Sequence, residues 1–296
     1  RPDDRRRLDA SLRQSAAVVP AADAPRTVPL TLDVLAQAPG AVPVEVTADV
    51  PDDWSVAPVP PMVVKSHGLP TQRSVDVVVT VPAGTPIGNY PVRVTAEGPN
   101  TVVREAVIEV REAATCAVAG EQCAVDLTRE LNHDGTATVA ASGQGDFDGQ
   151  GWSYDAALLP AAGPVTWGGV TYQAPDATGT AANFVEARGQ AMLLPAGEHG
   201  ALKLVAASHN GPVTASVTVR YADGSTAEAP VTVGDWAGSG GTVVLDMPHR
   251  IKAGQGVDGP PVRLFGLSVP LDPAKAVHSV TLPDDPRVEV YAITLV

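Results

Sequence analysis

The chain has 296 residues, a formal net charge of −13 and a hydrophobic content of 44%. This excess of negative charge argues against nucleic acid and anionic membrane surfaces as partners. No run of about 18 apolar residues occurs, so no membrane-spanning helix is expected. A chain of this length is typical of two domains.

The residue usage favours an all-β fold. The chain contains 28 Pro and 28 Gly, which separate short runs rich in Val and Thr, and aromatic residues make up only 4%. Such a pattern indicates many short strands joined by turns, as in β-sandwiches. The chain begins at Arg1, without Met or a signal peptide, so we expect a processed product or a piece of a longer protein. Arg outnumbers Lys, and Ala, Val, Gly and Pro are abundant, which is typical of a high-GC bacterial genome.

Residues 1–26 are interpreted as an N-terminal connector. Residues 1–14 are rich in arginine, and residues 15–26 are rich in Ala, Val and Pro, which favours an extended linker. Leu8 and Leu12 are spaced as on a short helix, and that alternative stays open.

Residues 27–112 are predicted to form an immunoglobulin-like (Ig-like) sandwich. Strands follow one another at short intervals, with Pro and Gly between them. The strand candidates are Val28–Leu35, Val42–Val50, Ser74–Val81, Val92–Ala96 and Val102–Val110. The segment Val81–Val94, with its Gly88-Asn89-Tyr90 element, resembles the Ig-like domain associated with NPCBM-type carbohydrate modules in bacterial glycosidases. The resemblance implies that Tyr90 packs near a corner of the sandwich. Trp54 is expected to be a core residue.

Residues 113–125 form the expected domain junction, without a strand signal. Cys116 and Cys123 lie there, and a disulfide is favoured over free thiols. Two thiols with no His at ligand spacing cannot complete a zinc site.

Residues 126–296 are predicted to form a larger, jelly-roll-like β-sandwich. The Asp223-Gly224 pair between two alternating strands predicts a hairpin. The strand candidates are Thr136–Ala140, Gly169–Tyr172, Gln190–Leu194, Ala201–Ala206, Val213–Tyr221, Thr226–Val233, Thr242–Asp246, Val262–Val269, Val277–Leu282 and Val288–Val296.

The segment from Asp146 to Tyr154 is the most informative stretch of the chain. Asp146 and Asp148 lie two residues apart on a glycine-rich loop, which suggests a calcium site. Further oxygen ligands are expected from Asn132 and Asp134, and from Asp126, if the Asn132–Gly135 turn folds beside this loop. The alternative is that these residues form ordinary turns.

Several side chains are candidates for carbohydrate binding. Trp152, Tyr154 and Trp236 offer flat apolar faces on which a sugar ring stacks, and His209 and Asn210 lie in a polar turn. Because aromatic residues are scarce, each Trp is also a candidate core residue.

The second sandwich resembles C-terminal accessory β-sandwiches of secreted bacterial glycoside hydrolases. The resemblance rests on Asn132-His133-Asp134-Gly135, the Asp146–Tyr154 segment, Asn183–Gln190 and Asp235-Trp236. It implies a non-catalytic region of an extracellular enzyme, in which a spacer precedes a module that binds carbohydrate or supports an upstream catalytic domain of the same polypeptide. The chain lacks the strand–helix rhythm of a catalytic barrel, and no catalytic residue is assigned. A purely structural sandwich and an independent cell-surface adhesin are the alternatives.

Overall fold

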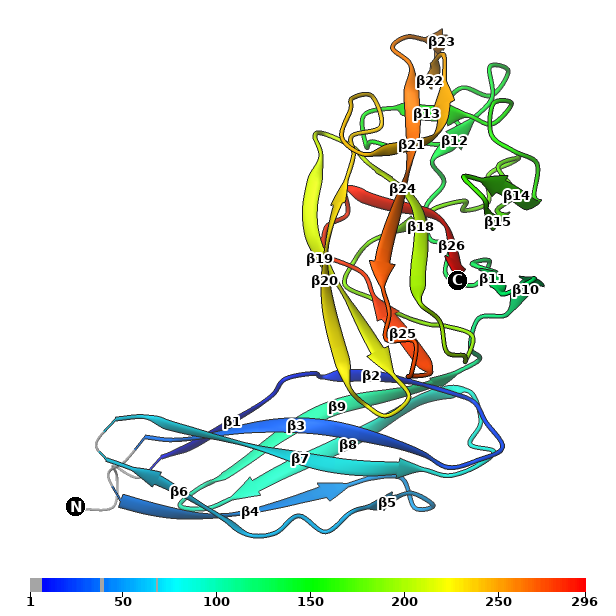
Figure 1. Ribbon diagram of the computed structural model, residues 1–296. Coiled ribbons are helices and arrows are strands. Elements are labelled where there is room, and N and C mark those ends of the chain that lie inside the picture. Colours follow the sequence, from blue (N-terminus) through cyan, green and yellow to red (C-terminus); the bar gives the residue numbers. More distant parts are fainter. Residues whose placement is uncertain (1–6, 38–39, 68) are drawn as a thin grey trace. The chain divides into compact units, whose positions relative to one another are not determined.

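A computed structural model describes residues 7–37, 40–67 and 69–296, and the chain divides into two compact units, Arg1–Ala113 (unit 1) and Ala114–Val296 (unit 2) (Figure 1). No helix occurs among these described residues. Accordingly, no helix that could cross a membrane is found in this part of the chain. The expected all-β fold class, with one sandwich following another, is confirmed.

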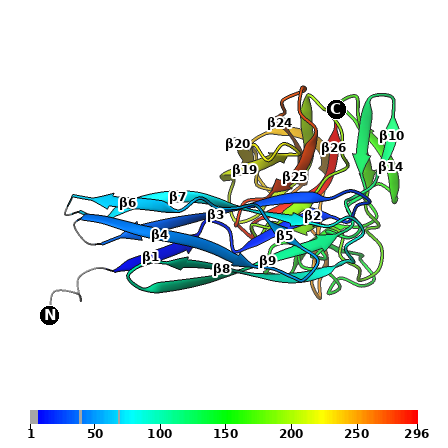
Figure 2. The ribbon, with the colours of Figure 1, turned by 90° about the horizontal axis from the view of Figure 1, so that it is seen from below.

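Unit 1 is an Ig-like sandwich whose long strands run along one another (Figure 2). Val, Leu and Ile side chains alternate inward along the strands and fill the space between the sheets. One sheet has the order β1 (Leu8–Leu12), β3 (Arg26–Ala36), β7 (Thr71–Val81), β5 (Ser55–Val56). The other has the order β2 (Ala16–Pro20), β9 (Thr101–Arg111), β8 (Gly88–Glu97), β4 (Gly40–Asp49), β6 (Met62–Ser66).

The prediction that residues 1–26 form a connector is wrong for β1 and β2. β1 pairs antiparallel with β3, and β2 pairs parallel with β9, so both strands belong to the sandwich. The side chain of Asn100 fastens β1, because it accepts the Leu8 N–H at 2.7 Å and donates to the Leu8 carbonyl at 2.9 Å. Both strands are five residues long, too short for their alternation to stand out in the sequence. Residues 1–6 lie outside the described residues.

Trp54 and Tyr90 of unit 1 pack as expected. Trp54 is buried, and its ring lies 4.9 Å from that of Tyr90. The Tyr90 hydroxyl donates to the carbonyl of Pro86 at 2.7 Å, which closes the turn before β8. This corner therefore joins an aromatic contact to a local hydrogen bond.

Unit 2 is built on a main sheet with a second sheet packed against one face. The main sheet has the order β10 (Cys116–Ala119), β11 (Gln122–Val125), β26 (Val288–Leu295), β18 (Ala201–Ser208), β24 (Val262–Pro270), β21 (Thr242–Met247), and β16 (Val185–Glu186) also pairs with β26. The second sheet has the order β17 (Ala191–Leu193), β25 (Val277–Thr281), β19 (Val213–Tyr221), β20 (Thr226–Val233). The predicted hairpin at Asp223-Gly224 joins β19 and β20, and Gly224 has a φ of 85°.

Short strands and loops cover the opposite face of the main sheet. They include a small sheet of β12 (Thr136–Ala137), β13 (Trp152–Asp155), β22 (Arg250–Lys252) and β23 (Gly256–Asp258), and the hairpin of β14 (Gly163–Trp167) and β15 (Val170–Ala174). An aliphatic core fills the space between the main and second sheets, whereas an aromatic core lies under these short strands. The main sheet is therefore buried on both faces.

The central strand β26 contributes to both cores. Val288 and Val290 point into the aliphatic core, so the residue between them, Glu289, points to the aromatic side. The pairing of β26 with β18 contains a bulge at Tyr291, which belongs to the aromatic core together with its neighbour Ala292. The alternation of β26 therefore decides where Glu289 lies.

Cys116 and Cys123 form the expected disulfide, with their Cα atoms 5.3 Å apart. They lie on β10 and β11, which pair antiparallel, so the expected junction without strands is in fact the first hairpin of unit 2. β11 also pairs with β26. The disulfide therefore closes a small hairpin at the edge of the main sheet.

We expect replacement of both cysteines by alanine to lower the free energy of unfolding of unit 2 by about 2 kcal/mol. The crosslink closes a short loop and so removes little chain entropy from the unfolded state. Urea denaturation of the wild type and the Cys116→Ala/Cys123→Ala variant measures the loss. Intact mass under non-reducing conditions provides the control, since the wild type should lack two hydrogens relative to the reduced chain. Two alkylatable thiols in the native wild type would contradict the pairing.

Candidate functional site

The aromatic core of unit 2 gathers residues that are distant in the sequence. The Phe147 ring lies 4.7 Å from the rings of both Tyr154 and Trp236, and 5.3 Å from that of Phe184. Tyr154 and Trp236 are buried. Their suggested role as sugar-stacking platforms therefore does not agree with the structure, and Trp236 takes the alternative role of a core residue.

Trp152 is half-buried and is held by charged neighbours. Lys252 Nζ lies 3.3 Å from the centre of its ring and Arg250 Cζ lies 4.5 Å from it. Its indole N–H donates to Oδ2 of Asp258 at 2.9 Å, and Arg250 also binds that oxygen. A sugar stacking on this ring would compete with both cations. The contacts indicate that Trp152 anchors the β22–β23 hairpin to β13.

The carboxylates expected to bind calcium accept backbone hydrogen bonds within their own loop. Asp146 Oδ1 accepts the N–H of Gly151 at 2.9 Å, and Asp148 Oδ1 accepts the N–H of Gln150 at 2.9 Å. Gly149 and Gly151 have positive φ angles of 71° and 84°, as the glycine-rich pattern predicts. The loop is thus held by its own side chains.

The other residues expected to bind calcium are engaged in a similar way. Asp134 Oδ1 accepts the side-chain N–H of Asn183 at 2.8 Å, and Asn132 Oδ1 accepts the N–H of Glu186 at 2.7 Å. Asp126 Oδ1 accepts the N–H of Thr128 at 2.9 Å. Among the described residues, no three of the Asp carboxylates bring ligand atoms within 4.8 Å of one another. A calcium ion on these loops stays a prediction.

A polar surface connects the Asp146–Gly151 loop to the turn after β18. Gln150 Nε2 donates to Asn210 Oδ1 at 2.7 Å, and Asn210 Nδ2 lies 2.9 Å from His209 Nδ1. Gln150 and Asn210 are exposed, and His209 is half-buried. Asn210 has a φ of 58°, the only positive φ of a non-glycine residue in the described part of the chain. We call these three side chains the amide–imidazole surface; it includes the expected residues His209 and Asn210.

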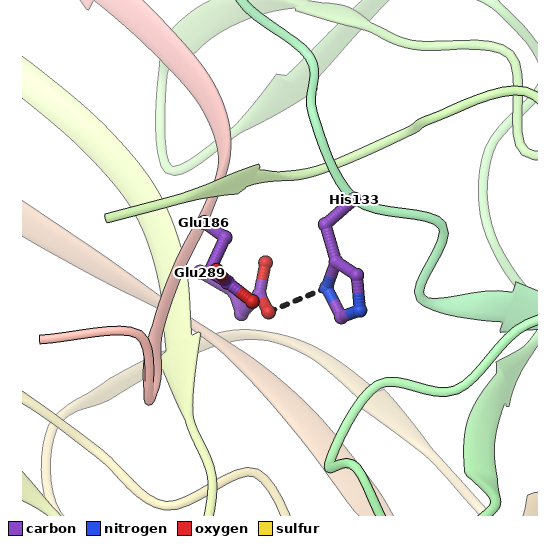
Figure 3. Close-up of side chains that lie close together, drawn as sticks. All are labelled: His133, Glu186 and Glu289. Carbon is purple, nitrogen blue, oxygen red and sulfur yellow. Dashed lines mark ion pairs between the residues drawn. The ribbon is translucent and has the colours of Figure 1, made fainter. Parts of the chain in front are cut away.

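A carboxylate–histidine cluster lies on the aromatic side of β26, where His133, Glu186 and Glu289 point toward one another (Figure 3). Glu186 on β16 is directly opposite Glu289 on β26. His133 lies in the segment before β12, which forms a bridge to Phe184. Its Nδ1 is 2.6 Å from Glu289 Oε1. One ligand atom from each residue lies within 4.8 Å of the others.

Burial governs the protonation of this cluster. The Glu289 side chain has no exposed surface, and burial raises its pKa to about 7, against the opposing effect of His133. Burial also acts to lower the pKa of His133, but the nearby Glu289 outweighs it, so that this pKa is raised. Glu186 is bound by the guanidinium of Arg188. The site therefore holds two carboxylates, an imidazole and one arginine.

Sequence reasoning did not find this cluster. His133 and Glu186 lie in segments on which the resemblance rests, yet neither was assigned a role. Glu289 offered one signal, a charged residue between the apolar residues Val288 and Val290 of a predicted strand. That pattern identifies an inward-facing charge only when both faces of the strand are known to be buried.

The fold and these sites define unit 2 as a β-sandwich domain. Residues 121–259 match the family model described as the AziU2-like β-sandwich domain. The match covers less than half of the chain; it includes His133 and Glu186, and it ends before Glu289. A search of curated protein sequences returned no match.

Some solved structures show distant similarity. PapD-like domain 7 of human CEP192 is 16% identical, with 35% of this chain and 86% of that chain covered and a TM-score of 0.24. The periplasmic chaperone SfaE is 10% identical, with 59% and 86% covered and a TM-score of 0.25. The Bacteroides ovatus protein SGBP-B, solved with a mixed-linkage heptasaccharide, is 10% identical, with 97% and 100% covered and a TM-score of 0.16. Similarity at this level does not indicate a function.

We expect Trp152→Ala to lower the free energy of unfolding of unit 2 by roughly 2 kcal/mol, because it removes a half-buried ring and its contacts with Lys252 and Arg250. Chemical denaturation measures the loss. Trp152→Phe is the control, since it keeps an aromatic ring beside the cations and loses the hydrogen bond to Asp258, and its effect should be smaller. An unchanged stability of Trp152→Ala would show that the ring does not anchor the hairpin.

We expect unit 2 without bound ions to lose stability as the pH rises from 5 to 8. The folded-state pKa of Glu289, about 7, exceeds the ordinary value of 4.5, so the folded state binds the extra proton in this interval. The raised pKa of His133 acts in the same direction, and we expect a total change of roughly 2 kcal/mol.

Thermal unfolding in EDTA, compared between the wild type and Glu289→Gln, measures this pH dependence. His199 and His209, whose pKa values are lowered by burial, act in the opposite direction in both proteins, so the difference between the two profiles reports Glu289 together with its effect on His133. Parallel profiles would contradict the assignment.

Proposed function

We propose that this chain is a non-catalytic accessory region of a secreted bacterial glycoside hydrolase. In this proposal unit 1 is a spacer, and unit 2 binds carbohydrate weakly beside the catalytic domain of the same polypeptide. The amide–imidazole surface is the observation that carries the binding role. Gln150 and Asn210 are exposed, already ordered by their mutual hydrogen bond, and able both to donate and to accept hydrogen bonds from sugar hydroxyl groups.

The backbone of Asn210 supports this choice of surface. A non-glycine residue with positive φ costs conformational energy and persists where its surroundings hold it. Here the N–H of the next residue, Gly211, donates to Asp235 Oδ2 at 2.6 Å, which holds the turn. The Asn210 amide is thereby presented in one orientation, which reduces the entropy lost when a ligand binds.

The carboxylates of unit 2 support a non-catalytic role. A glycosidase places two carboxyl groups on either side of an accessible glycosidic bond. Glu186 and Glu289 lie next to each other, and Glu289 has no exposed surface from which to reach a sugar. Asp146 and Asp148 bind their own loop. The disulfide between Cys116 and Cys123 supports an extracellular location, because such bonds persist in oxidising compartments.

We expect the purified chain to bind at least one polysaccharide of a panel of chitin, cellulose, xylan, starch and peptidoglycan, with a Kd of about 1 mM for soluble fragments. Asn210→Gly removes the amide but suits the backbone, and Gln150→Ala removes its partner. Each change should weaken binding about three- to tenfold, as expected for the loss of one or two hydrogen bonds. Pull-down and titration calorimetry measure this.

Gln255→Ala is the matched control, because Gln255 is an exposed glutamine on another turn of unit 2. It should bind as the wild type does. Equal binding by all variants would show that the amide–imidazole surface is not the binding site. If the chain binds no member of the panel, carbohydrate binding is contradicted and unit 2 has a purely structural role. Hydrolysis of aryl glycosides by the purified chain would contradict the non-catalytic assignment.

A further inference from the structure

The register of the main sheet places two acidic side chains side by side. Glu186 and Glu289 are direct partners in the antiparallel pairing of β16 with β26. Like charges in this position repel each other. Arg188 binds Glu186 from the exposed side, so Glu186 has a compensating cation. Among the described residues, no arginine or lysine forms an ion pair with Glu289, whose ion-pair partner is His133.

Glu289 is a buried carboxylate without an aligned hydrogen-bond donor. The residue is 0% exposed, and neither Oε1 nor Oε2 has a hydrogen-bond partner. Nδ1 of His133 also lacks one, although it lies 2.6 Å from Oε1. Buried polar atoms are nearly always satisfied, and an unsatisfied group indicates a missing partner such as a water or an ion. One ligand atom each from His133, Glu186 and Glu289 lies within 4.8 Å of the others, where the three side chains point toward one another (Figure 3).

His133 has the surroundings of a metal-binding histidine. The backbone of Asp146, in the glycine-rich loop, contributes to the raised pKa of His133. Ligating histidines usually donate their second ring N–H to an acceptor such as a backbone carbonyl, which orients the ring and leaves the lone pair of the other nitrogen for the metal. Nδ1 of His133 faces Glu289. The Asp146 loop therefore supports the cluster through its backbone.

We propose that His133, Glu186 and Glu289 bind a divalent transition metal ion, with zinc as the best match. One imidazole nitrogen and two carboxylates suit zinc and its neighbours better than calcium, which prefers six to eight oxygen ligands. A cation between the strands offsets the repulsion between the two glutamates. It also supplies the partner that the Glu289 oxygens lack.

The size of the site is compatible with such an ion. Zinc–ligand bonds of roughly 2.0–2.2 Å place tetrahedral ligand atoms roughly 3.3 Å apart. The ligand atoms of the three residues lie within 4.8 Å of one another, and the Nδ1–Oε1 pair at 2.6 Å needs to open by less than about 1 Å. The side chains of His133 and Glu186 are 23% and 14% exposed, so an ion can enter from their side, and a water molecule can complete the coordination.

The ion would connect three parts of unit 2. Glu289 belongs to the central strand, Glu186 to the short strand beside it, and His133 to the segment that packs against the Asp146 loop. Because an ion that binds only the folded state stabilises it, occupancy should raise the melting temperature of unit 2. This site is distinct from the predicted calcium ligands, whose carboxylates lie in the loops.

The test uses the full chain without a histidine tag, stripped with EDTA and then titrated with zinc chloride. We expect one zinc ion per chain by calorimetry and elemental analysis. At a hundredfold excess of zinc over its Kd, we expect a rise of roughly 5–10 °C in the melting temperature. Cobalt chloride should give visible absorption bands of a low-symmetry nitrogen–oxygen site.

Glu289→Gln and His133→Gln should each abolish the thermal shift and the cobalt bands. His249→Gln is the matched control, because His249 forms a similar contact, 2.8 Å from Asp155, in another part of unit 2. It should keep both signals. The proposal is overturned if zinc, manganese and cobalt leave the melting temperature unchanged, or if the shift persists in Glu289→Gln and His133→Gln. A shift with calcium chloride alone would also overturn it, and would point to the loop carboxylates.

Discussion

The pairing of β26 is the constraint on which the organisation of unit 2 depends. This strand pairs with β18 on one edge and with β11 and β16 on the other, and both of its faces are covered. Its side chains must therefore divide between an aliphatic and an aromatic core. The bulge at Tyr291 keeps Ile293 and Leu295 on the aliphatic side while two consecutive residues, Tyr291 and Ala292, contact the aromatic core. Glu289 enters the aromatic side because it lies between two valines.

Most of the aromatic residues of unit 2 gather in one core, and Glu289 of the carboxylate–histidine cluster is buried beside it. This aromatic core concentrates rings on one side of the main sheet, where Phe147 packs edge to face against Tyr154 and tilted against Trp236, while Tyr154 and Phe184 are stacked. Large rings leave polar side chains such as Glu289 enclosed at their margin. The same packing removes Tyr154 and Trp236 from the surface.

The loops around this core stabilise their own backbone and also contact residues that are distant in the sequence. Asp146 and Asp148 hold their loop through bonds to its backbone, as short acidic side chains in turns commonly do. A loop held in this way offers a fixed backbone to His133 and a fixed side chain, Gln150, to Asn210. The glycine-rich segment is thus the element that connects the polar surface to the buried cluster.

Much of the fold could be predicted from the sequence, because alternation and turn residues act over short distances. The long strands, the Asp223-Gly224 hairpin, the buried Trp54 and the Cys116–Cys123 bond all follow from local patterns. The short strands were missed, since β1, β2, β13 and β16 offer too few residues for a period to appear. Their existence depends on the neighbours to which they bond.

By itself, the sequence determined that the chain is all-β, acidic and divided into two sandwiches, because composition and period-2 patterning follow directly from residue types. Only the tertiary structure decided which aromatic rings are buried and which acidic groups meet. Glu186 and Glu289 are about a hundred residues apart in the chain and become neighbours through strand register alone. Strand register is set by pairing across the whole sheet, so the residues next to either glutamate do not predict it.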